Sequence, residues 1–126
     1  MAQDNLFMLV DDNKIDLFIH TEIIKQISSK ANCLNFNFAG DALLYLSNEK
    51  NNWPSIILLD IHMPIMNGFD FLLQYKKLPD NLRSICKIIM LSSSLNPNDQ
   101  EKIKQESEVF AFIEKPLSVD KIRNAL

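Results

Sequence analysis

The sequence alternates short apolar runs with longer stretches in which apolar residues recur at helical spacing. Four runs are apolar at almost every position and a fifth alternates with polar residues: Leu6–Val10, Ile56–Leu59, Ile88–Leu91, Val109–Ile113 and, alternating, Leu34–Ala39. Short, continuously apolar runs are typical of central strands in a parallel sheet, because helices cover both faces of such a sheet. The alternating run predicts a strand nearer an edge, with one wetter face.

Helical patterns lie between these runs. After Asp12, residues at helical spacing predict one apolar stripe, formed by Ile15, Phe18, Ile19, Ile23 and Ile27. We expect further helices over 41–47, from Phe69 to a point before Pro79, from an N-cap at Asn96, and from Ser118 onward. Strand and helix therefore alternate five times, which favours a doubly wound (βα)5 sandwich around a five-stranded parallel sheet.

The composition and charge of the chain limit which partners it can bind and where in the cell we expect it. The 126 residues carry a net charge of −3 and fit one domain over 1–126. This charge argues against nucleic acid or an anionic membrane as the main partner, since both select a basic surface. We see no basic and apolar leader and no apolar run near the ~20 residues that span a bilayer, so we expect a cytoplasmic protein. Cys33 and Cys86 lie in no CxxC motif and are interpreted as small hydrophobes.

Chemically active side chains follow four of the apolar runs. In chain order they are Asp11 with Asp12, Asp60, Ser92 and, one residue further on, Lys115. Ligands in doubly wound sheets bind beyond the carboxyl ends of the strands, so these groups should converge. Three neighbouring carboxylates either raise a pKa or recruit a hard cation such as Mg²⁺. With an ammonium and a hydroxyl beside them, the pattern indicates phosphoryl transfer to one of the carboxylates.

The segment from Leu58 to Gly68, Leu-Leu-Asp-Ile-His-Met-Pro-Ile-Met-Asn-Gly, resembles the phosphoacceptor loop of response-regulator receiver domains. Asp11-Asp12, Ser92 and Lys115-Pro116 resemble the other signatures of that family, in the same order, so the resemblance covers essentially the whole chain. It implies a flavodoxin-like fold with strand order 2-1-3-4-5. It also implies a two-component signalling domain that is not an enzyme in its own right, because it catalyses only its own phosphorylation and dephosphorylation.

The resemblance further implies how the acidic residues act. Asp60 would accept a phosphoryl group from a phosphohistidine on a sensor kinase or phosphotransfer protein. Asp12 would bind Mg²⁺ directly, Asp11 would bind it mainly through water, and Asp60 would give the third carboxylate. The backbone carbonyl of His62 would be the remaining protein ligand. We expect the His62 side chain to lie solvated beside the site, because imidazole is a poor ligand for Mg²⁺.

The same resemblance implies a switch. Ser92 would move towards the phosphoryl group, Lys115 would bind one of its oxygens, and Phe112 would be the coupled aromatic residue. The family often has Thr and Tyr at the first and last of these positions, and Phe112 lacks the phenolic hydrogen bond. By analogy, a downstream protein or a second copy of the chain would bind the surface formed by the last strand and the helices from Asn96 and Ser118. We expect His20, on the first helix, to face solvent.

Other functions are open at this stage. An aspartate-nucleophile phosphohydrolase would want a second Asp where His62 stands. A flavodoxin-like flavin binder would need a phosphate loop rich in Ser, Thr and Gly where Asp11 and Asp12 stand. A receiver-like domain that is never phosphorylated is disfavoured because all five site positions are present. The chain can be a stand-alone regulator or a fragment of a larger protein, and the cognate kinase, stimulus, output and phosphoryl lifetime are not encoded in these motifs.

Overall fold

A computed structural model describes residues 2–94 and 96–126, with side chains from residue 5 onward. The strands form one parallel sheet in the order β2-β1-β3-β4-β5. Their bounds are β1 (Ala2–Val10), β2 (Asn32–Phe36), β3 (Trp53–Asp60), β4 (Lys87–Ser92) and β5 (Val109–Glu114). The predicted parallel sheet and its strand order are therefore confirmed, and the alternating second run lies at an edge. The continuously apolar run over Val109–Ile113 was predicted to be a central strand, but β5 lies at the other edge.

Six helices accompany the sheet in the described residues, one more than the sequence pattern predicts. They are α1 (Lys14–Ile27), α2 (Ala39–Ser47), α3 (Gly68–Tyr75), α4 (Asp80–Ile85), α5 (Pro97–Gln105) and α6 (Val119–Ala125). The additional helix is α4, which begins directly after Pro79. Its one buried side chain is Leu82, and Arg83 pairs with Asp80 and Glu108. Proline ends the preceding helix here and also starts a new one, because a helix start needs no N–H from it.

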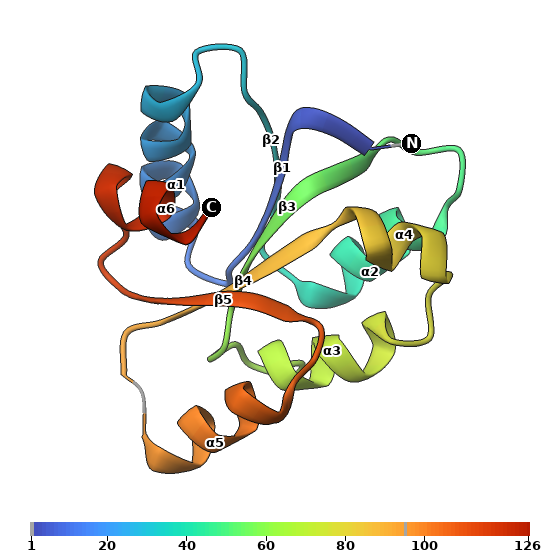
Figure 1. Cartoon of the computed structure of the whole chain (residues 1–126), viewed down its shortest axis with the longest axis vertical. Helices are drawn as coiled ribbons and strands as arrows, with labels where there is room; N and C mark the ends of the chain where they lie inside the picture. Colours follow the sequence, from blue (N-terminus) through green and yellow to red (C-terminus); the bar gives the residue numbers. More distant parts are fainter. Residues whose placement is uncertain (1, 95) are drawn as a thin grey trace.

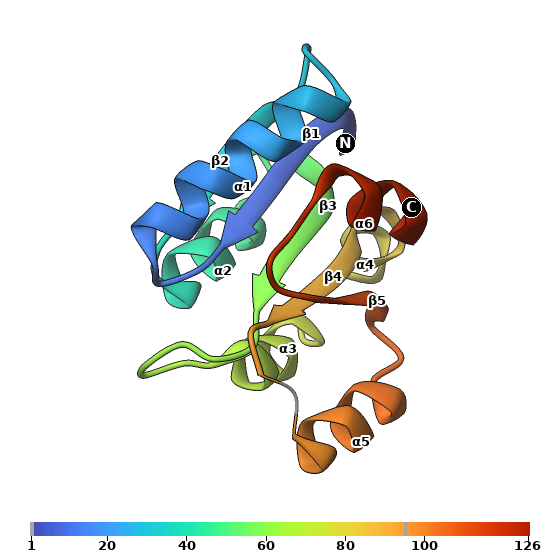
Figure 2. The same ribbon diagram turned by 90° about the vertical axis from the view of Figure 1, so that its left-hand side faces the viewer.

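The helices cover both faces of the sheet, with α1 and α6 on one face and α2, α3 and α4 on the other (Figures 1 and 2). Alternate side chains of a strand point to opposite faces of the sheet. In β1, for example, Phe7 and Leu9 pack with the α1–α6 layer, whereas Met8 and Val10 pack with the opposite layer. Burial on both faces explains why the central strands are continuously apolar.

Helix α1 corrects two of our expectations. The side chains that it buries are Leu17, His20 and Ile24, which share one face of the helix. Ile15 and Phe18 were predicted to lie in the buried stripe but are 70% and 67% exposed. The prediction that His20 faces solvent is also wrong, because only 4% of this residue is exposed. Apolar residues occupy both faces of α1, so helical spacing alone selects the wrong one.

The start of α3 packs directly against the end of β3. Asn67 and Asp70 form a reciprocal capping box, in which each side chain accepts a hydrogen bond from the other residue's backbone N–H. Gly68 donates its N–H to the Ile61 carbonyl at 2.8 Å. A Cβ on Gly68 would lie 2.8 Å from the carbonyl oxygen of Asp60. Glycine therefore allows the helix to approach the backbone that carries Asp60.

Candidate functional site

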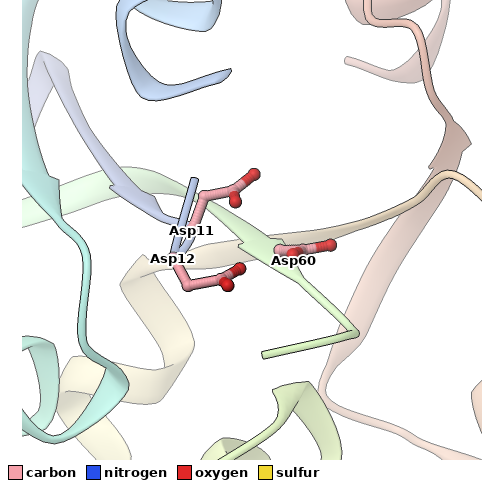
Figure 3. A group of neighbouring side chains, drawn as sticks. All are labelled: Asp11, Asp12 and Asp60. Atoms are coloured by element: carbon pink, nitrogen blue, oxygen red, sulfur yellow. The ribbon is translucent and has the colours of Figure 1, made fainter. Parts of the chain in front are cut away.

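Three carboxylates meet at the carboxyl edge of the sheet. Val10 of β1 pairs with Leu59 of β3, so the residues that follow them, Asp11 and Asp60, are neighbours. One oxygen from each of Asp11, Asp12 and Asp60 lies within 4.8 Å of the others. Figure 3 shows the three side chains extending from the strand ends in similar directions. Asp11 and Asp60 are buried whereas Asp12 is exposed, so the cluster opens to solvent on one side.

Local backbone contacts fix these carboxylates. The Asp11 N–H donates to the Phe36 carbonyl at 3.0 Å, which ties the end of β1 to the end of β2. The Asp11 carboxylate accepts a hydrogen bond from the Asn13 N–H at 3.0 Å. The side chain of Asn13 in turn caps α1. The acidic edge, which consists of Asp11, Asp12 and Asp60, is therefore held at Asp11 by the same contacts that end β1 and begin α1.

Lys115 brings a positive charge to the acidic edge. Its Nζ donates to Asp11 Oδ2 and to Asp16 Oδ2, both at 2.9 Å, and lies 3.6 Å from Asp60 Oδ1. Burial by itself lowers the pKa of Lys115. Hydrogen bonds to Asp11 and Asp16 and the charges of Asp11 and Asp60 outweigh that effect, so the pKa is raised and the side chain stays cationic.

The surroundings of Asp60 oppose its ionisation. Burial and the negative charges of Asp11 and Asp12 raise the pKa of Asp60 to about 6, against the opposing effects of Lys115 and of a hydrogen bond with the His62 backbone. Without a further cation, the acidic edge therefore carries more negative charge than Lys115 can offset. This is the electrostatic condition in which a carboxylate cluster binds a divalent cation.

Ser92 ends β4, the strand next to β3, and Phe112 lies on β5, the strand beyond it. Ser92 is fully buried, and its hydroxyl donates to the Ser94 carbonyl at 2.6 Å. Its own carbonyl accepts a hydrogen bond from the Lys115 N–H at 2.8 Å, which joins the ends of β4 and β5. Phe112 is half-buried and lines a cavity of about 190 Å³ with Gln100 and Ile103 of α5. The structure thus places the hydroxyl beside the acidic edge and the aromatic ring further back along β5.

The His62 side chain is half exposed, as expected, and bridges two segments. Its Nε2 lies 3.2 Å from the Ser94 carbonyl oxygen and 3.3 Å from Asp99 Oδ2 in α5. Asp99 is 7% exposed. The loop after Asp60 is therefore in contact with the loop after β4 and with the first turn of α5.

Three polar residues near the site were missed by sequence reasoning. Asp16 shares the ammonium of Lys115 with Asp11, and His20 lies one helical turn beyond it on α1. Burial and the charge of Lys115 lower the pKa of His20, so its ring is uncharged at neutral pH. The third residue is Asp99. Asp16 stands in the first turn of the helix that follows Asp12, which is a local signal, but its partner is 99 residues away.

A family model for the response regulator receiver domain matches residues 7–126. The chain belongs to this family. Receiver domains are signalling domains of two-component systems, and the structure gives this one the acidic edge, the hydroxyl and the lysine on the strands where the motifs predicted them.

Curated relatives agree with this assignment. The response regulator Rcp1 of Synechocystis is 31% identical over 98 residues, which cover 75% of this chain and 65% of the relative. The sensory/regulatory protein RpfC of Xanthomonas campestris is 22% identical over 119 residues, which cover 94% of this chain. The matched segment is only 16% of the length of RpfC, so this chain spans a small part of that relative.

Solved structures show the same fold. A two component response regulator from Cytophaga hutchinsonii superimposes with a TM-score of 0.86 at 29% identity, over 99% of this chain and 95% of that one. A response regulator receiver protein from Dyadobacter fermentans gives 0.84 at 29% identity, over 94% and 92%. No helix within residues 2–94 and 96–126 is long and apolar enough to cross a membrane.

Proposed function

We propose that residues 1–126 form one receiver domain that is phosphorylated on Asp60 and thereby switches its protein contacts. The observation that carries this proposal is the position of Asp60: a buried carboxyl group at the end of β3, close to two other carboxylates and 3.6 Å from the Lys115 ammonium. A carboxylate nucleophile next to a fixed cation is the arrangement that phosphoryl transfer requires.

In the proposed reaction, one Asp60 oxygen attacks the phosphorus of a phosphohistidine on a sensor kinase or phosphotransfer protein. An O–P bond forms on Asp60 as the N–P bond breaks, and the donor imidazole keeps the electron pair and takes a proton from solvent. Lys115 would stabilise the charge on the phosphoryl oxygens. Hydrolysis of the aspartyl phosphate by water would restore the carboxylate and release inorganic phosphate.

The acidic edge fits Mg²⁺. Its donors are hard carboxylate oxygens, and the opening beside Asp12 leaves room for the waters that Mg²⁺ retains. Asp11, Asp12, Asp60 and the His62 backbone carbonyl would hold the ion. When bound, Mg²⁺ would neutralise charge on the transferring phosphoryl group. Asp60 would then be ionised at neutral pH, ready to act as nucleophile.

The proposed readout surface is formed by α5, β5 and α6. Ser92 would turn from the Ser94 carbonyl towards the phosphoryl group, and Phe112 would repack beside α5. On the same strand, Phe110 is 48% exposed beneath the Lys87 ammonium. A downstream protein or a second copy of the chain would bind this surface in the cytoplasm.

The first test is the intact mass of the protein after incubation with Mg²⁺ and acetyl phosphate. We expect the wild type to gain one phosphoryl group only when Mg²⁺ is present, and Asp60→Asn to gain none. No gain in the wild type, either from acetyl phosphate or from a phosphorylated kinase, would indicate a receiver that is never phosphorylated. A gain that persists in Asp60→Asn would place the acceptor at another residue.

A further inference from the structure

Two carboxylates hold the Lys115 ammonium, and neither is the proposed acceptor. Asp11 and Asp16 each accept a hydrogen bond from Nζ at 2.9 Å, whereas the nearest oxygen of Asp60 is 3.6 Å away. The side chain of Lys115 is 13% exposed and that of Asp16 is 29% exposed. The pair is therefore protected from the full screening by water and salt that weakens surface ion pairs.

Asp11 and Asp16, the two carboxylates that hold Lys115, differ in their relation to the candidate metal site. Asp11 belongs to the carboxylate cluster that could hold a metal ion, whereas Asp16 lies outside it on α1. A cation bound between Asp11, Asp12 and Asp60 would weaken the hold of Asp11 on Lys115. Asp16 would then be the remaining anchor of the ammonium. A phosphoryl group on Asp60 would have to draw Lys115 away from Asp16.

We propose that Asp16 is a positioning residue that holds Lys115 on the α1 side of the site and competes with the phosphoryl group for its ammonium. The proposal rests on the proposed phosphorylation of Asp60. In the unphosphorylated state, Asp16 shares the ammonium with Asp11 and keeps it from moving closer to Asp60, which leaves the carboxylate cluster more available to a cation. In the phosphorylated state, the same contact limits how strongly Lys115 binds the phosphoryl oxygens.

The surroundings of Lys115 allow it to move between these partners. Lys115, Asp16 and His20 line one cavity of about 320 Å³, so the lysine side chain does not fill a close-packed core position. The buried His20 ring is uncharged at neutral pH and adds no second cation next to the ammonium. The position of Lys115 is therefore determined mainly by the carboxylates around it.

A double-mutant cycle tests this role. Wild type, Asp16→Asn, Lys115→Met and the double variant would be titrated by calorimetry with Mg²⁺ alone, and with beryllofluoride, a mimic of the phosphoryl group, at saturating Mg²⁺. We expect Asp16→Asn to tighten beryllofluoride binding by about threefold to tenfold, within the range of coupling between contacting residues. We expect it to weaken Mg²⁺ binding by about twofold to threefold, because the released ammonium stays on Asp11 and moves closer to Asp60.

The control is Glu22→Gln, which also removes one negative charge from α1 but pairs with Lys25 instead of Lys115. In the Lys115→Met background, the effect of Asp16→Asn should shrink to the size that Glu22→Gln produces. Independent, additive effects of the Asp16 and Lys115 substitutions on both ligands would overturn the role of Asp16. Circular dichroism would show whether each variant folds. If Asp16→Asn lost its helical signal, Asp16→Ser would replace it in the cycle.

The outcomes separate this inference from the function on which it rests. A wild type that binds Mg²⁺ but neither beryllofluoride nor a phosphoryl group would contradict the proposed function, and the Mg²⁺ cycle alone would then decide the role of Asp16. A wild type that binds Mg²⁺ and beryllofluoride, with no coupling between Asp16 and Lys115, would leave the function intact and remove the inference. A wild type that binds no Mg²⁺ would overturn both.

Discussion

At the scale of single residues, Asp60 has to satisfy two opposing demands. A nucleophilic carboxyl group must be ionised, yet a site that excludes water from phosphoryl transfer disfavours ionisation. Burial and the neighbouring Asp11 raise the pKa of Asp60 to about 6, and Lys115 offsets only part of this. The folded chain therefore holds the acceptor in a state whose charge depends on what is bound beside it.

This shift predicts how stability depends on pH in the presence of a chelator. Between about pH 4 and 6 the native state retains a proton on Asp60 that the unfolded chain releases, so the free energy of unfolding falls as pH rises through this window. A shift of about two units corresponds to at most about 3 kcal/mol. We expect Asp60→Asn to be more stable than wild type by about 1–3 kcal/mol at pH 7.5, with a difference that shrinks towards pH 4 in urea titrations.

Magnesium supplies the control for that measurement. Adding Mg²⁺ at pH 7.5 should stabilise the wild type by mass action and have a much smaller effect on Asp60→Asn. At pH 5, where Asp60 holds its proton more often, the stabilisation of the wild type should diminish. A wild type whose stability rises between pH 4 and 6 relative to Asp60→Asn would contradict the raised pKa of Asp60.

A second prediction at the scale of single residues concerns His62 and the rate of dephosphorylation. Its ring bridges the Ser94 carbonyl and Asp99 at the edge of the site. We hypothesise that the ring restricts the approach of water to the phosphoryl group. His62→Ala should then speed dephosphorylation by about fivefold, equivalent to about 1 kcal/mol in the barrier, when phosphate release is followed after removal of the donor. Asp99→Asn, which loosens the ring without removing it, should have a smaller effect, and an unchanged rate in His62→Ala would end this hypothesis.

At the scale of elements, the contact between α3 and the end of β3 fixes the backbone that carries Asp60. Gly68 lies where a Cβ would be 2.8 Å from the Asp60 carbonyl oxygen and 2.9 Å from Ile61 Cα. Both are backbone atoms within or next to a central strand. Neither atom can move without shifting β3, so the helix start and the site are mechanically connected.

Gly68→Ala should therefore destabilise the protein by about 1–3 kcal/mol, as overpacking does, and displace Asp60. The measurement is the urea midpoint, followed by the rate of phosphorylation by acetyl phosphate. Gly40→Ala is the matched control: the three atoms nearest to its Cβ would all belong to the ring of Phe38, a residue that is 37% exposed, so a side chain and not a strand backbone would have to shift. Gly40 lies in α2, where alanine is the better helix former, so this variant should keep or gain stability. Equal losses in both variants would contradict the contact with β3.

The elements also show where the sequence pattern carries information and where it does not. The central strands were predictable because burial on two faces leaves a strong compositional signal, and alternation marked β2 as an edge strand. The same signal was misleading for β5, which is apolar but lies at the other edge and buries only Ile113. Helix α4 was not predicted, since only Leu82 of its six residues is buried. The buried face of α1 was misjudged because Ile15 and Phe18 are apolar yet exposed. Periodicity detects a helix, but apolar residues on two faces do not say which one meets the sheet.

At the scale of the whole molecule, the parallel topology accounts for the candidate site. The carboxyl ends of all strands meet at one edge, so Asp11, Asp12, Asp60 and Lys115 could be brought together from sequence order alone. The contacts Lys115–Asp16 and His62–Asp99 could not be predicted from sequence order. They depend on the placement of α1 against the loop after β5 and of α5 against the loop after β3, and no local pattern specifies these distances.

The proposed switch also belongs to this scale. Ser92→Ala and Phe112→Ala should both be phosphorylated on Asp60, because neither removes the acceptor or Lys115. Both should lose most of the phosphorylation-dependent change in binding to a partner or to a second copy of the chain, since the hydroxyl and the ring would connect Asp60 to α5 and β5. The measurements are intact mass for phosphorylation and sedimentation or partner titration for binding. Unchanged partner affinity in both variants would exclude this route.

The acidic edge and Lys115 together gather residues from the first strand, the middle of the chain and the loop after the last strand. No fragment that lacks any one of these segments contains the complete set of charges. The carboxylates that would hold a metal ion come only from the ends of β1 and β3, so metal uptake can report one step of assembly: in a refolding or translation experiment, the signal should appear once β1 and β3 have paired, whether or not β5 has docked. The chain thus offers a readout of β1–β3 pairing that needs no added label.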